Sequence, residues 1–218
     1  MNLDAEIIRT GLIYYLLLVI CIAIHEWAHA IVADRLGDHT PAAQGRVTLN
    51  PLVHLDPIGT GLIPLANIFL LRGSSFGLIG WGRPVQINLG NFPPHRRMLC
   101  DLLVTLAGPL SNAVLALLGV LMAVASHGHR ELTGLFLQFI QLNVVMVVFN
   151  LLPIPPLDGS HVMRYIVGLK EETYLRLSQV GGILLLVLIN VPAFQKAMGE
   201  LIGWGMQPYL RLYHALIS

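Results

Sequence analysis

The chain has 218 residues, of which 55% are hydrophobic and only 11% are charged, and its mean hydropathy is +0.70. Soluble domains usually carry about a quarter charged residues, so this composition and the long apolar runs predict a protein embedded in a lipid bilayer. The net charge of +1 and the lack of a basic patch with interleaved aromatic residues argue against a nucleic-acid partner. The two cysteines, Cys21 and Cys100, lie in apolar stretches and are interpreted as buried free thiols.

The first apolar run covers about residues 11–36 and stops at Gly37, a residue type common just after a helix C-terminus. Residues 1–10 contain Asp4 and Glu6 against only Arg9, which is the wrong charge for the start of a signal peptide. The apolar run also exceeds the length of a typical signal-peptide core. We therefore expect a retained membrane helix.

Unusual segments separate this helix from the next clear span. Residues 38–57 form a polar loop, and residues 58–71 are apolar but short for a full crossing. For this short segment, a re-entrant or interfacial course and a complete span remain equal alternatives. Residues 72–97 are rich in glycine and proline, and residues 85–87 indicate a short strand beside the membrane.

The second half contains further apolar runs at about residues 99–125, 132–152 and 177–191, and the remaining stretch to residue 218 has the pattern of an interfacial amphipathic helix. The sequence therefore predicts an all-α polytopic membrane protein. We expect a bundle of four to six membrane segments, with a short re-entrant or strand-like insertion between the first span and the next full span. The expected organisation is a single domain over residues 1–218, with its core at about residues 11–165.

Within the first span, His25, Glu26 and His29 form the pattern His-Glu-x-x-His. On a helix, residues four apart lie on one face about 6 Å apart along the axis, so two imidazoles at this spacing can bind one zinc ion. The glutamate between them can then act on water as a general base. Ionisable groups inside a membrane helix are costly to bury and usually serve function, although three groups that only bond to one another or face water are the alternative.

The basic residues suggest an orientation for this helix. Most of the arginines and lysines fall in connections that one topology places on the same side, whereas only Arg130 marks the opposite turn. By the positive-inside rule, the first helix then runs from the outside to the cytoplasm. His25 would lie about 16 Å from the cytoplasmic end of the helix, which places the site within the membrane but nearer the cytoplasmic side.

A catalytic zinc ion usually has three protein ligands and one open position. The strongest candidate for the third ligand is Asp158, which follows a proline-rich turn and precedes Gly159, where the backbone can approach another group closely. Asp158 could instead cap the helix that follows it. The other acidic candidates are less favourable: Asp34 on another face of the first helix, Asp101 at the start of the second clear span, and Glu171 and Glu172 in a charged connection.

Six motifs follow one another in the chain, and together they cover about residues 20–165. They are His25-Glu-Trp-Ala-His29, Gly45-Arg-Val-Thr-Leu-Asn-Pro51, His54-Leu-Asp-Pro-Ile-Gly59, Gly80-Trp-Gly-Arg-Pro84, Ala107-Gly-Pro-Leu-Ser-Asn112 and Asn150-Leu-Leu-Pro-Ile-Pro-Pro-Leu-Asp-Gly159. This set resembles the site-2 protease family of intramembrane zinc metalloproteases, in particular its small bacterial and archaeal members. The chain departs from larger relatives in lacking a PDZ domain and an extra helix before the His-Glu-x-x-His helix.

The resemblance implies a role for each matching residue. His25, His29 and Asp158 would bind Zn²⁺, Glu26 would be the general base, and Asn150 would position the substrate or stabilise the oxyanion. The implied activity is cleavage of peptide bonds in or near transmembrane segments of other membrane proteins. The expected partners are a transmembrane-helix substrate and the lipid bilayer, and the expected location is a prokaryotic inner or plasma membrane.

Further polar residues are weaker candidates. His54 and Asp56 could bond to the second ring nitrogens of the zinc-binding histidines, or they could equally stabilise their own loop. Asn112 could bond across helices near the site, with simple packing as the alternative. The segment 76–88, if strand-like, could pair with an extended substrate, or it could only cover the membrane surface.

Two other classes of function remain as alternatives. A zinc transporter would also place histidine and aspartate in helices, but transporters often contain internal repeats and none is evident in this sequence. A non-catalytic membrane scaffold could retain the fold. The intact Glu26 argues against a scaffold, because zinc binding alone does not need a base.

Overall fold

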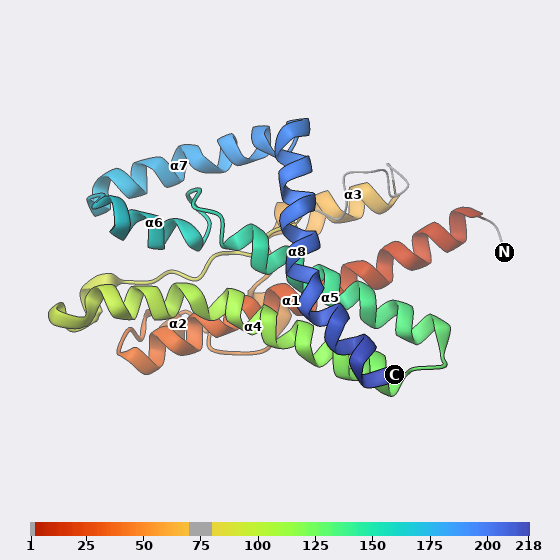
Figure 1. Cartoon of the computed structure of the whole chain (residues 1–218). Coiled ribbons are helices and arrows are strands. Elements are labelled where there is room, and N and C mark those ends of the chain that lie inside the picture. The colour runs from red at the N-terminus through yellow and green to blue at the C-terminus, as the bar shows by residue number, and fades with distance from the viewer. Residues whose placement is uncertain (1–2, 70–79) are drawn as a thin grey trace. The chain divides into compact units, whose positions relative to one another are not determined.

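The computed structural model of the chain describes residues 3–69 and 80–218 (Figure 1). The chain divides into two compact units, Met1–Phe92 and Pro93–Ser218. Helices dominate both units, and the described part contains no β-ladder, which confirms the predicted all-α membrane-type fold. The single domain expected over residues 1–218 stays a prediction.

The first unit is built on helix α1, Leu3–Leu36, which has 34 residues and contains the predicted first span. It ends where expected: Gly37 adopts a φ of 109°, a left-handed conformation that residues with a Cβ rarely adopt. The N–H of Asp38 then bonds the Ala33 carbonyl at 3.0 Å, which satisfies one of the carbonyls left open at the helix end.

The short apolar segment after the loop folds as helix rather than strand. A π-helical turn, Pro57–Leu62, leads directly into α3, Ile63–Phe69, and Asp56 caps the pair by accepting hydrogen bonds from the N–H groups of Ile58 and Gly59. This helix is shorter than a complete crossing requires. It packs on α1 near Gly11, where an added Cβ would lie 3.0 Å from the Ile68 side chain. Residues 70–71 of the predicted segment lie outside the described residues.

Residues 80–88 are extended, but the strand predicted at residues 85–87 is not formed. In the described part of this segment, the one β-bridge is antiparallel and pairs Leu55 with Gly82. The prediction was wrong because the amide of Val85, on the same edge as those of Trp81 and Arg83, donates to the side-chain carboxylate of Glu26 rather than to a backbone carbonyl. At the end of the segment, the amide of Asn88 donates likewise to the carboxylate of Asp38. The remaining short helical elements of this unit are α2, Thr40–Ala43, and single turns at Pro51–Val53 and Leu89–Asn91.

The second unit is a helical bundle. It begins with a turn at Pro94–Arg96 and contains α4, Arg97–Ala125; α5, Arg130–Asn150; α6, Gly159–Val167; α7, Glu171–Leu188; and α8, Pro192–Ile217. α4 and α5 form an antiparallel pair that α8 crosses (Figure 1). Small residues allow the close approach: a Cβ on Gly119 of α4 would lie 2.8 Å from Ile140 of α5. Tyr213 of α8 is buried in the same core.

Within the described residues, three helices are long and apolar enough to cross a membrane: Ala5–Leu36, Pro94–Ala125 and Arg130–Asn150. α7 and α8, bent by 92° where they meet, would make a fourth span if they are counted as one. The lower limit of the predicted range of four to six therefore requires this bent pair. α8 packs along α4 and α5, and its predicted interfacial position in the bilayer stays a prediction.

Candidate active site

The two histidines of the His-Glu-x-x-His motif meet on the buried face of α1. His25 and His29 are one turn apart, and only 5% and 8% of their surfaces are exposed. Their Nε2 atoms lie 3.1 Å from each other, with the rings nearly perpendicular. Two nitrogen ligands of a tetrahedral zinc ion, each about 2.0–2.1 Å from the metal, are separated by about 3.3 Å. The histidine pair therefore fits two adjacent positions of a zinc site.

Glu26 lies beside this pair and is half-buried. Its Oε2 atom accepts a hydrogen bond of 3.2 Å from the backbone N–H of Val85, in the extended segment. The same segment approaches α1 very closely at Gly82, where an added Cβ would lie 2.6 Å from Ile22 and 3.2 Å from the Cγ atom of Glu26. The candidate base is thus held by a backbone amide 59 residues away in the sequence.

His54 and Asp56 make contacts that stabilise their own loop, which was one of the two predicted alternatives. His54 is fully buried, and its Nε2 atom bonds the Thr48 carbonyl at 2.8 Å. The carboxylate of Asp56 caps the helix at Pro57–Phe69. The structure therefore explains both residues by the fold of the loop around α1, and a direct role for them at the zinc ligands stays a prediction.

In the second unit, the turn from Asn150 to Gly159 folds back tightly on itself. An added Cβ on Gly159 would lie 2.2 Å from the carbonyl oxygen of Leu151, so only glycine fits there. Asp158 is half-buried at the N-terminal end of α6, although its side chain forms no capping hydrogen bond. The helix-cap alternative for Asp158 is therefore not observed, and metal binding by this residue stays a prediction.

Two asparagines of the second unit bond to α5. Asn150 lies at the end of α5, and its Nδ2 atom donates to the Met146 carbonyl, which leaves its second N–H to serve as a donor elsewhere. Asn112 of α4 is fully buried and donates to Asn143 of α5 at 2.9 Å. The predicted bond of Asn112 across helices is therefore present. Its partner Asn143, equally buried, was missed by the sequence analysis.

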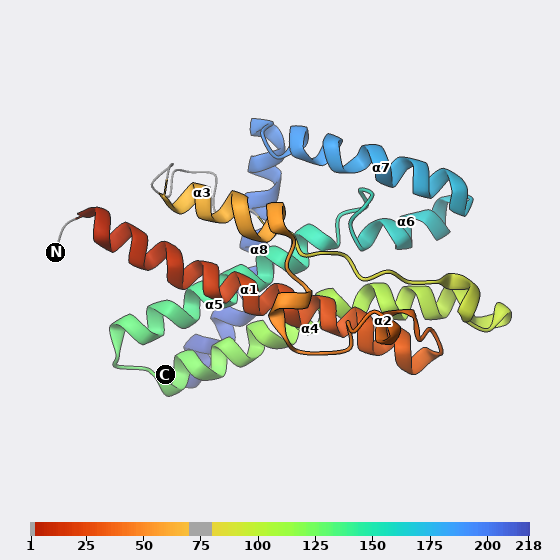
Figure 2. The ribbon, with the colours of Figure 1, turned by 180° about the vertical axis from the view of Figure 1, so that it is seen from behind.

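The sequence analysis also missed a buried polar network around Asp101. Asp101 of α4 is 2% exposed, and it accepts hydrogen bonds from the Tyr165 hydroxyl at 2.7 Å and from Nδ1 of His161 at 3.2 Å. Both donors belong to α6, the helix that follows Asp158. α6 and α7 run back along each other (Figure 2), and Tyr174 of α7 contacts the His161 ring edge to face. Burial and the bond to Asp101 raise the pKa of Tyr165 above its ordinary value, so its hydroxyl remains a donor.

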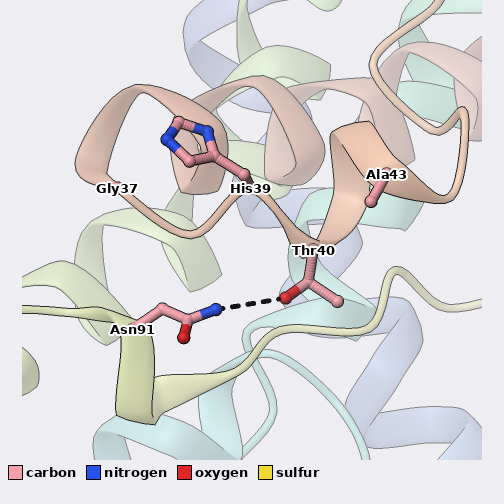
Figure 3. Close-up of a pocket in the computed structure, with 5 residues that line it drawn as sticks. All are labelled: Gly37, His39, Thr40, Ala43 and Asn91. Atoms are coloured by element: carbon pink, nitrogen blue, oxygen red, sulfur yellow. Dashed lines mark hydrogen bonds between the residues drawn. The ribbon is translucent and has the colours of Figure 1, made fainter.

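A hollow in the first unit is lined by Gly37, His39, Thr40, Ala43 and Asn91 (Figure 3). It contains none of the predicted ligands, and its wall is organised by Asp38, which is fully buried. Burial would raise the pKa of Asp38, but hydrogen bonds from Thr40, Asn88 and Asn91 outweigh it and lower the pKa below its ordinary value. Asp38 therefore connects the end of the extended segment to the end of α1 through hydrogen bonds.

Taken together, apolar helices of membrane-spanning length and a buried His-Glu-x-x-His pair on one of them are typical of a membrane metalloprotease, and comparisons with known proteins identify the family. A family model described as Peptidase family M50 matches residues 126–189. The chain is 38% identical over 212 residues to "Putative zinc metalloprotease YwhC" of Bacillus subtilis, covering 92% of this chain and 90% of that protein. It is 35% identical over 202 residues to "Putative zinc metalloprotease Rip2" of Mycolicibacterium smegmatis, covering 87% and 73%, respectively.

A third relative, Rip2 of Mycobacterium tuberculosis, is 32% identical over 194 residues, with 85% of this chain and 70% of that protein covered. No solved structure matches the chain. The chain belongs to peptidase family M50, the site-2 protease family, and it is a metalloprotease whose metal is zinc.

The hydrogen bond between Tyr165 and Asp101 should stabilise the second unit. We expect Tyr165→Phe to lower the free energy of unfolding by about 1–2 kcal/mol, because it leaves a buried carboxylate with one donor fewer. Thermal unfolding of the purified protein in detergent would measure the effect. Tyr209→Phe is the matched control, since its hydroxyl makes a longer bond of 3.3 Å to a neutral carbonyl. Equal losses in the two variants would contradict a special role for the Asp101 network.

Asp38→Asn should destabilise the first unit by about 2 kcal/mol at neutral pH, because the new amide group would face the N–H of Asn88. The pKa of Asp38 is lowered on folding, so its stabilising effect is complete above the ordinary aspartate pKa and disappears as the pH falls below about 4. Unfolding measured from neutral pH downward should therefore show wild type and variant converging. Asp34→Asn, which removes a partner of the exposed His39, should cost less at neutral pH.

Proposed function

We propose that this protein is a zinc-dependent intramembrane endopeptidase that hydrolyses peptide bonds in or near transmembrane segments of membrane proteins, in the manner of regulated intramembrane proteolysis. The observation that carries the proposal is the buried pair of Nε2 atoms, 3.1 Å apart, with Glu26 beside it on a helix apolar enough to span a bilayer. The proposed location is a prokaryotic plasma membrane, with the active site nearer the cytoplasmic side. The arrangement of basic residues supports this orientation.

In the proposed site, His25 and His29 of α1 and Asp158 before α6 would hold the zinc ion. A bound zinc ion would supply Lewis acidity, which would make a water molecule more acidic and polarise the scissile carbonyl. Glu26 accepts a proton from the attacking water and delivers it to the leaving amine. The free N–H of Asn150 can donate to the oxygen that gains negative charge, a type of contact worth about 3–4 kcal/mol in a soluble protease.

A substrate helix must unwind before its carbonyls can react, and the extended segment 80–88 is suited to hold the unwound strand. Along this segment, the N–H groups of Trp81 and Arg83 point inward and bond the carbonyls of Gly59 and His54. Because neighbouring residues of an extended chain face opposite ways, we expect the N–H of Gln86, the residue after Val85, to face the outer edge. Among the described residues, this N–H forms no hydrogen bond to another backbone group. An extended substrate could pair with this outer edge. Residues 76–79 of the predicted segment lie outside the described residues.

A zinc transporter and a non-catalytic scaffold are the alternatives to this proposal. Both predict zinc binding without a requirement for Glu26. Membership of a metalloprotease family favours the protease, and the position of Glu26 beside the histidines gives that assignment a chemical basis.

Glu26→Gln tests the general base directly. We expect this variant to retain about one zinc per chain and to cleave a fluorescent transmembrane-helix substrate about 10²–10⁴ times more slowly than wild type, because the amide cannot accept the proton. Asp158→Asn is the companion variant and should lower zinc content as well as activity. Equal cleavage by wild type and Glu26→Gln would refute the protease mechanism, and zinc movement into sealed vesicles would favour a transporter.

Gln86→Pro tests the outer edge. The substitution removes the outward N–H, so we expect weaker substrate binding, seen as a several-fold rise in KM, with zinc content unchanged. Gln86→Ala is the matched control, because it loses the same side-chain contact with Gln44 but keeps the backbone donor. If both variants bind substrate equally well, the segment does not pair with substrate at this position.

A further inference from the structure

The extended segment also has an inner edge, and one of its hydrogen bonds ends on a catalytic group. The inner N–H groups of Trp81 and Arg83 donate to backbone carbonyls, at 3.4 and 2.8 Å. The next inner N–H, that of Val85, donates instead to Oε2 of Glu26 at 3.2 Å. A side-chain carboxylate therefore stands where the pattern would otherwise place a third carbonyl.

We infer that the backbone amide of Val85 positions the general base. Its hydrogen bond fixes one oxygen of the Glu26 carboxylate and leaves the other, Oε1, for proton transfer. Val85 acts through Glu26 and is a positioning residue rather than a catalytic one. This inference rests on the proposed function, because it explains how the carboxylate of Glu26, the general base of the proposed reaction, is oriented.

The register of the segment is fixed on both sides of Val85, as a positioning role requires. On the N-terminal side, the Thr60 hydroxyl donates to the Trp81 carbonyl at 2.6 Å. The guanidinium of Arg46, which is 5% exposed, donates through one nitrogen to the carbonyls of Val53 and Arg83. A buried arginine that bridges two loops in this way holds both against α1.

On the C-terminal side, the N–H of Asn88 donates to Asp38 at 2.7 Å. Between these anchors, Gly82 lets the backbone lie against α1, where a Cβ would meet Ile22 at 2.6 Å. A slip of one residue would turn the Val85 amide away from Glu26. It would offer in its place either Pro84, which has no N–H, or the amide of Gln86.

A fixed carboxylate matters because proton transfer depends steeply on geometry. A long glutamate side chain has several rotamers, and one that turns away from the water contributes nothing to catalysis. A displacement of about 1 Å at a catalytic group can cost about 100-fold in rate. A donor from the backbone is well suited to this task, since it cannot rotate away and does not change its protonation.

The test compares two variants of Val85. Val85→Pro removes the backbone N–H, whereas Val85→Ala also loses most of the valine side chain but keeps the backbone N–H. With a transmembrane-helix substrate in detergent, we expect kcat of Val85→Pro to be about 10- to 100-fold below that of Val85→Ala, with similar KM and the same zinc content. Gln86→Pro provides the contrast, because a proline on the outer edge should raise KM instead. Equal kcat values for the two Val85 variants, or a loss of zinc that matches the loss of activity, would overturn the inference.

A second pair of variants decides the question if Val85→Pro does not fold. Gly82→Ala keeps every N–H but pushes the segment away from α1, so it should lower kcat at constant zinc content. Ile22→Ala removes the side-chain atom nearest to the new Cβ, so Gly82→Ala combined with Ile22→Ala should recover activity relative to Gly82→Ala alone. No recovery in the folded double variant would overturn the inference.

These outcomes are separable from failure of the proposed function. If wild type and Glu26→Gln cleave equally well, the proposed protease mechanism itself is wrong. If Glu26→Gln is inactive but the two Val85 variants have the same kcat, the mechanism stands and only the positioning role of Val85 is refuted.

Discussion

The structure depends on how ionisable side chains are satisfied inside a chain that is mostly apolar. An acidic group taken out of water costs several kcal/mol unless hydrogen bonds replace its hydration. In the first unit, Glu26 and Asp38 receive backbone amides of the extended segment. In the second unit, Asp101 receives donors from α6. Each of these carboxylates therefore joins parts of the chain that are distant in sequence, and the polar groups determine how the apolar helices are connected.

This constraint explains why the extended segment is not a strand. A strand would pair its inner amides with a neighbouring backbone, as Trp81 and Arg83 do. Val85 and Asn88 donate to carboxylates at two points on or just beyond α1, so the segment follows the helix rather than a second strand. In the proposed function, the outer edge would pair with substrate, while the inner edge bonds to groups of the enzyme itself. Such a division suits a protease, because substrate pairing on one edge need not disturb the groups held by the other.

Much of the fold could be predicted because hydropathy and helix ends are local properties. The stop at Gly37 and the spans that became α4 and α5 were predicted to within about two residues, and the His25–His29 pairing follows from helix geometry alone. The partners of the polar residues could not be predicted in this way. Nothing local in the sequence shows that His161 bonds Asp101, 60 residues earlier, or that Val85 bonds Glu26. The available signal was the presence of an acidic residue in an apolar run, which indicates that a partner exists but not which residue it is.

The glycines show a related limit and connect the fold to the chemistry. Gly59, Gly82 and Gly159 look alike in the sequence, but each permits a different close approach: to the Trp81 ring, to α1 beside Glu26, and to the Leu151 carbonyl. Two of these contacts fix the extended segment, and the third closes the turn that carries Asp158. Irregular backbone at membrane depth is tolerated only where protein or a water-filled cavity surrounds it. Glycine lets that backbone pack against helices closely enough to be covered, so the same contacts that hide the irregular segments also hold the candidate catalytic groups in place.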